Sequence, residues 1–114
     1  RSDLSFTLFL NEPTDYEGGE LIIQTIHNTE KIKLSAGEMI IYPSTQLHSV
    51  AKVKDGERYV CVGWIQSYVQ NNEDRNFLFG LDAGAKGLLA KHGRSDELDL
   101  IFQAYSNILR RLGD

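Results

Sequence analysis

Six short segments rich in β-forming residues dominate the first two thirds of the chain. Turn-forming residues such as Pro13, Gly37 and Pro43 separate them, at intervals of roughly ten residues. Residues 16–20 are predicted to form a turn, and the Asp55-Gly56 pair is typical of a tight hairpin, although jelly rolls use similar turns to cross between sheets. The segments cover residues 4–10, 20–25, 30–34, 39–42, 48–53 and 58–65. Short strands at this spacing are typical of antiparallel all-β domains. The sequence therefore predicts a mainly β fold, built as a sandwich, a jelly roll or a barrel.

The last third of the chain has a helical pattern instead. Asp74 is placed to cap a short helix that carries Phe77 and Leu78, and residues 84–93 favour a further helical turn. Ser95 and Asp96 precede a clear helix whose apolar residues recur at helical spacing: Leu98, Ile101, Phe102, Tyr105, Ile108 and Leu109. We therefore predict a helix from Glu97 to Leu112, and we divide the chain into residues 1–70, with six strands, and residues 71–114, a helical extension.

Composition excludes several classes of protein. The formal net charge of −4 over 114 residues argues against binding to nucleic acid or to an anionic membrane. No run of apolar residues approaches the roughly 18 that a membrane span needs. Cys61 is the single cysteine, so no internal disulfide is available, and its position inside an apolar segment predicts a buried thiol. These features fit a cytoplasmic protein.

Two residues are candidates for binding a metal ion and a carboxylate. His48 begins one β segment and Arg58 begins the next. A neutral imidazole is a ligand for iron(II) or zinc, and a guanidinium grips a carboxylate through two parallel hydrogen bonds. Arg58 shares its alternation phase with Val60, Val62 and Trp64, which favours an inward-facing side chain that needs an anionic partner.

Simpler interpretations of both residues stay open at this point. His48 could be a hydrogen-bonded surface histidine, and Arg58 could be an exposed charge paired with Glu57 or Asp55. Phe9 and Trp64 are candidates to line a pocket, although aromatic residues in strands more often belong to a core. The chain has no H-x-D or H-x-E pattern before His48, so these residues alone do not complete a metal site.

Five strings, taken in order, resemble a known enzyme family: TLFLN, YEGGELII, KIKLSAGEMIIYPS, LHSV and GERYVCVGWIQS. Together they are similar to the iron(II)/2-oxoglutarate dioxygenases of the prolyl 4-hydroxylase superfamily, and most of all to the bacterial PKHD-type hydroxylases. This resemblance implies a double-stranded β-helix, that is, a jelly roll, followed by the helical extension. It also implies that His48 is the distal iron ligand and that Arg58 binds the C5 carboxylate of 2-oxoglutarate.

The resemblance carries further expectations. Trp64 matches a tryptophan common in the last strand, whereas Phe9 replaces a tyrosine that hydrogen-bonds the co-substrate in some relatives. The implied cofactors and co-substrates are Fe(II), 2-oxoglutarate and O₂, with ascorbate as an additional candidate. The other two iron ligands of the family come from an H-x-D motif upstream of the strand formed by TLFLN. We therefore expect this chain to be the C-terminal part of a hydroxylase, inactive by itself, with an unknown prime substrate.

Two other functions remain as alternatives. The first is a non-catalytic jelly-roll module that binds a small anion through Arg58, with a purely structural His48. The second concerns the C-terminal helix, whose apolar stripe could pair with that of a second copy in a homodimer. We expect instead that the stripe packs on the β barrel of its own chain.

Overall fold

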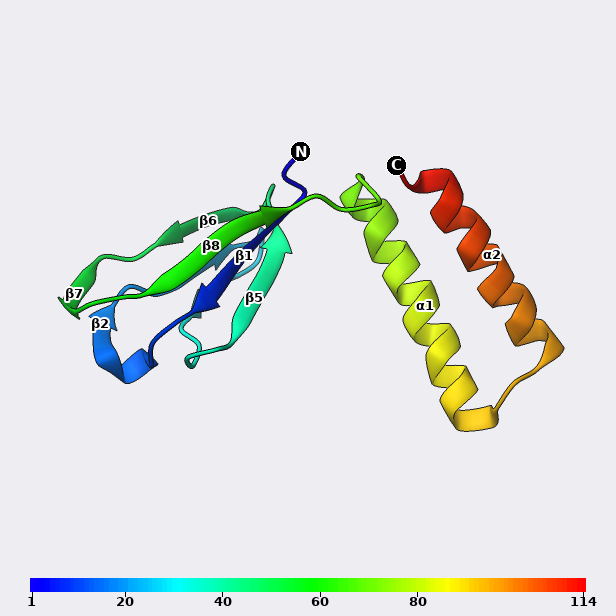
Figure 1. Cartoon of the computed structure of the whole chain (residues 1–114), viewed down its shortest axis with the longest axis horizontal. Coiled ribbons are helices and arrows are strands. Elements are labelled where there is room, and N and C mark those ends of the chain that lie inside the picture. The colour runs from blue at the N-terminus through cyan, green and yellow to red at the C-terminus, as the bar shows by residue number, and fades with distance from the viewer. The chain divides into compact units, whose positions relative to one another are not determined.

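The computed structural model describes residues 1–114, and the chain divides into two compact units (Figure 1). The β unit spans Arg1–Gln66, and the helical unit spans Ser67–Asp114. Each unit is described by itself. No helix in either of them has the length and apolar character needed to cross a membrane.

The β unit contains eight strands, all paired antiparallel. Two three-stranded sheets have the orders β5-β1-β8 and β4-β3-β6, and a two-stranded ribbon joins β2 to β7. The strands are β1 (Leu4–Phe9), β2 (Tyr16–Gly18), β3 (Leu21–Gln24), β4 (Thr29–Ile32), β5 (Met39–Pro43), β6 (Leu47–Val50), β7 (Val53–Gly56) and β8 (Val60–Ile65).

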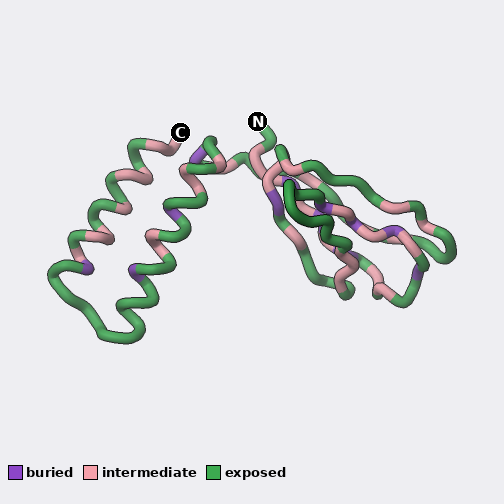
Figure 2. Tube along the Cα trace, turned by 180° about the vertical axis from the view of Figure 1, so that it is seen from behind, coloured by how far each residue is buried: buried purple, intermediate pink, exposed green.

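The two larger sheets face each other across a small core. In β1 every second residue is buried, namely Ser5, Thr7 and Phe9, because successive side chains point to opposite faces of a strand (Figure 2). Residues directly opposite them in β8 are Val60, Val62 and Trp64. From the second sheet, Leu21 and Ile23 pack against Tyr42 of β5, with Ile32 and Ile40 beside them. The inner faces of both sheets thus contribute to one interior.

The structure has two strands more than the sequence predicted. Tyr16–Gly18, expected to be a turn, forms β2 and pairs with β7 through a register shift between Glu17 and Gly18. The Asp55-Gly56 turn does not make the tight hairpin that its sequence suggests, because β7 pairs with β2 whereas β8 pairs with β1. Gly56 has φ 74°, and a Cβ there would lie 2.3 Å from the carbonyl oxygen of Asp15.

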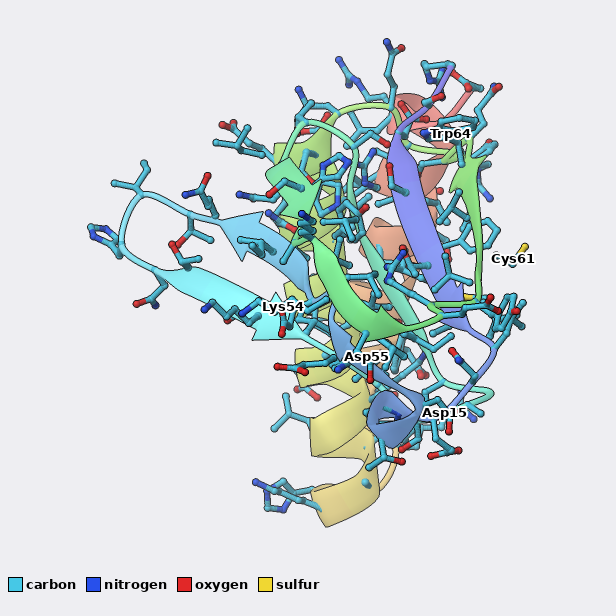
Figure 3. All side chains as sticks on the ribbon, turned by 90° about the vertical axis from the view of Figure 1, so that its left-hand side faces the viewer. Asp15, Lys54, Asp55, Cys61 and Trp64 are labelled. Atoms are coloured by element: carbon cyan, nitrogen blue, oxygen red, sulfur yellow. The ribbon has the colours of Figure 1, made fainter.

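Cys61 corrects one prediction: its side chain is exposed rather than buried. It lies opposite Leu8, on the outer face of the β5-β1-β8 sheet, and Figure 3 shows its sulfur pointing outward. An apolar sequence pattern does not tell which face of a strand is covered, so the prediction failed for that reason.

The helical unit consists of α1 (Asn72–His92) and α2 (Asp96–Leu112), which pack against each other. Asn71 caps α1 and Ser95 caps α2. In each case the side-chain oxygen accepts a hydrogen bond from the backbone amide three residues later, that of Asp74 in α1 and that of Leu98 in α2. The α2 prediction is confirmed and begins one residue earlier than expected. In contrast, α1 replaces the predicted short helix and separate turn with one helix of 21 residues, capped by Asn71 instead of Asp74.

Candidate functional site

A cavity of about 200 Å³ lies between the two larger sheets. Strands β1, β5 and β8 of one sheet and β3 and β6 of the other contribute to its wall, together with the loop before β8. Its lining residues are Ser5, Phe6, Thr7, Leu21, Tyr42, His48, Val50, Arg58, Val62, Gly63 and Trp64. His48 and Arg58, which the sequence singled out separately, therefore line the same cavity.

His48 is held in a defined orientation. It lies in β6 opposite Ile23 of β3, on the face that supplies the core. Its Nδ1 is 2.8 Å from the carbonyl oxygen of Gln46, and because a carbonyl only accepts, Nδ1 carries the hydrogen. The edge of the ring meets Tyr42, with the ring centroids 5.0 Å apart. In the neutral ring, Nε2 therefore keeps the lone pair that a metal ligand needs.

Arg58 reaches the cavity from the loop that precedes β8, two residues before the strand begins. Its Nε and Nη2 atoms are buried and have no hydrogen-bond partner. The guanidinium carbon lies 5.9 Å from the centroid of the Phe9 ring. A buried cation without an anion is costly, so these two atoms are available to an anionic partner.

The neighbouring carboxylate does not supply that partner. Glu57 accepts a hydrogen bond from the hydroxyl of Tyr59, and this contact raises the pKa of Tyr59 above its usual value. Since Nε and Nη2 of Arg58 are buried and unpaired, the interpretation of Arg58 as an exposed charge paired with Glu57 or Asp55 does not describe this structure.

The two aromatic candidates lie in different places. Trp64 lines the cavity on the inner face of β8 and is 70% exposed, so it stands at an open side of the site. Phe9 is 1% exposed and is not among the lining residues. Its ring lies against Arg58, where it supports the guanidinium from within the core.

Three lining residues that carry polar groups were not predicted from the sequence: Ser5, Thr7 and Tyr42. Ser5 and Thr7 are both buried polar side chains in β1, and the Ser5 hydroxyl is 2.8 Å from that of Ser44. Tyr42 contacts His48 and also lines the cavity. Polar residues at alternate positions of an otherwise apolar strand were the available signal, because an entirely structural core would have placed apolar residues there.

The chain offers one metal-ligating group at the cavity. The structure contains no cluster of three or more His, Cys, Asp or Glu residues that could hold a metal ion. His48, with its oriented ring and available Nε2, fits the role of a single ligand in a shared set. The unpaired atoms of Arg58 fit a carboxylate-bearing molecule beside it.

Comparisons with known proteins identify the family of this chain. Residues 1–66 match the model of the 2OG-Fe(II) oxygenase superfamily. The whole chain is 94% identical to a PKHD-type hydroxylase of Prochlorococcus marinus strain NATL2A and covers 52% of that protein. It is 75% identical to a PKHD-type hydroxylase of strain MIT 9211 and again covers 52% of it. The chain thus spans about half the length of these curated relatives. Because the family model covers more than half of this chain, the chain belongs to the 2OG-Fe(II) oxygenase superfamily.

Proposed function

We propose that this chain supplies the co-substrate anchor and one iron ligand of a 2-oxoglutarate-dependent hydroxylase. The observation that carries the proposal is the pair of buried, unpaired guanidinium atoms of Arg58 in the cavity that His48 also lines. Membership of the family implies Fe(II), 2-oxoglutarate and O₂. The PKHD-type relatives support hydroxylation as the reaction.

Arg58 would bind the far carboxylate of 2-oxoglutarate. A guanidinium presents parallel donors that match the two oxygens of a carboxylate, and charge-assisted hydrogen bonds are stronger in a partly desolvated site. The cavity has a volume of about 200 Å³, and its wall combines apolar side chains with a few polar groups. Such a site suits a short diacid. The fixed direction of the guanidinium would orient the co-substrate along the cavity.

His48 would bind the iron through Nε2. Its Nδ1–H donates to the carbonyl of Gln46, which holds the ring and leaves the opposite nitrogen free to act as a ligand. When bound, the iron supplies the activation of O₂ that couples decarboxylation of 2-oxoglutarate to hydroxylation of the prime substrate. The family resemblance assigns the remaining ligands to an H-x-D motif, which this chain does not contain before His48.

A double-stranded β-helix is the architecture that we infer for the complete β domain. Two facing three-stranded antiparallel sheets with a ligand-sized cavity between them support it. Ascorbate stays a candidate reductant for this enzyme class.

The test uses a full-length chimera in which this chain replaces the matching region of the NATL2A relative, which is 94% identical to it. We expect iron-dependent conversion of 2-oxoglutarate to succinate, with the apparent affinity for 2-oxoglutarate weakened at least about tenfold by Arg58→Lys. Lysine keeps the charge but loses the paired donors. His48→Ala should abolish turnover and weaken iron binding.

The matched control is Arg75→Lys, a half-buried arginine of the helical unit, which should leave the affinity for 2-oxoglutarate unchanged. An unchanged affinity in the Arg58→Lys chimera would refute the assignment of the anchor. Binding of 2-oxoglutarate without iron-dependent turnover would instead favour the non-catalytic anion-binding module.

A further inference from the structure

Tyr16 shares an unusual property with Arg58. Its hydroxyl is buried and has no hydrogen-bond partner, and the other buried side-chain atoms without a partner are Nε and Nη2 of Arg58. The side chain of Tyr16 is 5% exposed. Buried polar atoms are normally paired within the protein, so unpaired ones at one place indicate a missing ligand.

Gly19 brings the two side chains together. A Cβ at Gly19 would lie 3.2 Å from Cε2 of Tyr16 and 3.2 Å from Cδ of Arg58. Cε2 is bonded to the carbon that carries the hydroxyl, and Cδ is bonded to Nε. The ring edge of Tyr16 and the Cδ of Arg58 therefore both lie beside Gly19, so the two side chains that carry unpaired donors are neighbours, although Tyr16 is not itself among the residues that line the cavity. Gly19 itself is buried and has φ 70°, a conformation that favours glycine.

The ring of Tyr16 is fixed by contacts that leave its hydroxyl unused. Lys33 donates from Nζ to the carbonyl oxygen of Tyr16 at 2.7 Å, and the same ammonium lies 4.1 Å from the ring centroid. Tyr16 also begins β2, which pairs with β7. The backbone and the ring face are thus held in place, while the hydroxyl remains without a partner.

From these contacts we infer that Tyr16 donates a hydrogen bond to the same carboxylate that Arg58 binds. This inference rests on the proposed function, because it assigns a second donor to the co-substrate anchor. The two side chains together would offer a guanidinium fork and a phenol to one carboxylate, which has room for several donors on its two oxygens. Phe9, the aromatic ring that also lies against Arg58, has no hydroxyl to contribute.

Tyr16→Phe tests the inference because it removes the hydroxyl and keeps the ring. Isothermal titration of the metal-free chimera with 2-oxoglutarate should show affinity weakened roughly tenfold, since a hydrogen bond to a charged group is lost. The melting temperature of the same variant should stay unchanged or rise, because an unpaired buried hydroxyl is removed. A role that is merely structural would instead lower the melting temperature and leave the affinity unchanged.

Tyr59→Phe is the matched control, since the Tyr59 hydroxyl is bonded to Glu57 at the surface. It should leave the affinity unchanged. If Arg58→Lys weakens binding but Tyr16→Phe does not, the inference about Tyr16 is overturned and the proposed function stands. If neither substitution changes the affinity for 2-oxoglutarate, the proposed function itself is overturned.

Discussion

Two half-buried arginines, one in each unit, differ in whether their guanidinium groups have hydrogen-bond partners. Arg75 in the helical unit donates from Nη1 to the carbonyl oxygens of Val69 and Gln70, both at 2.8 Å, and from Nη2 to the side chain of Asn72. Arg58 in the β unit leaves Nε and Nη2 without any partner. The arginine side chain therefore holds backbone and side-chain groups together in the helical unit, whereas in the β unit two of its donor atoms remain unpaired.

The two units also differ in whether the polar groups described here are paired within the chain. In the helical unit, caps at Asn71 and Ser95 satisfy amides at the start of each helix, so its polar groups are used for folding. In the β unit, Tyr16 and Arg58 keep buried donors unused. Such atoms lower stability unless a ligand pairs with them, so their location favours the β unit, rather than the helical unit, as the place where a ligand would bind.

The largest effect on stability is expected from Gly19→Ala. The new methyl group would sit 2.9 Å from Cγ2 of Val53, at a φ that alanine adopts at a cost, so we expect a loss of about 2–3 kcal/mol. Crowding of Tyr16 and Arg58 should also weaken binding of 2-oxoglutarate. Chemical denaturation and calorimetric titration measure the two effects.

Gly37→Ala is the control for backbone strain alone. Gly37 has φ 87°, but nothing lies within 4 Å of a Cβ there. It should cost only about 1 kcal/mol and should not alter binding. Equal losses in the two variants would show that the packing around Gly19 is not tight.

The next effect compares the two arginines directly. Arg75→Met removes three hydrogen bonds and should destabilise the helical unit by about 2 kcal/mol, without changing the affinity for 2-oxoglutarate. Arg58→Met removes unpaired donors, so stability should be unchanged or higher while binding is lost. Urea denaturation monitored by circular dichroism, together with titration, measures both. A clear loss of stability in Arg58→Met would show that Arg58 stabilises the fold as Arg75 does, which contradicts the difference between the two units.

The smallest effect concerns the cap of α2. The Ser95 hydroxyl accepts a hydrogen bond from the amide of Leu98 at 3.1 Å, and Ser95→Ala should cost about 1 kcal/mol. Ser106→Ala, at an exposed position within α2, should change stability by less than about 0.5 kcal/mol. Similar values for the two variants, measured by thermal denaturation, would mean that the cap does not limit the stability of the helical unit.

Local signals explain which parts of the fold could be predicted. The α2 helix has a serine cap, a regular apolar stripe and a terminal glycine, and all of these lie within one stretch of sequence. The strands of the larger sheets were also recognisable from their apolar segments. In contrast, β2 has only three residues and exists because it pairs with β7, some 40 residues later in the sequence.

The site depended on long-range pairing that the sequence expresses weakly. The alternation of side chains along a strand predicted that Arg58 would face the same side as Val62 and Trp64, and all three line the cavity. No local pattern showed that β6 would bring His48 to the same cavity, because that follows from its pairing with β3. Tyr16 was missed because the glycines after it suggested a turn. The roles of His48 and Arg58 in binding iron and 2-oxoglutarate stay predictions until the variants are measured.

The glycines inside α1 have a consequence for how the helical unit opens. Gly80, Gly84 and Gly87 lie inside this helix, and nothing lies within 4 Å of a Cβ built at any of them. Each interior glycine lowers helix stability by roughly 0.5–1 kcal/mol relative to alanine. In α2, by contrast, Asp96–Leu112 contains no glycine. Hydrogen exchange should therefore proceed faster at the amides of central α1 than at those of α2, through local unfolding that leaves the β unit intact.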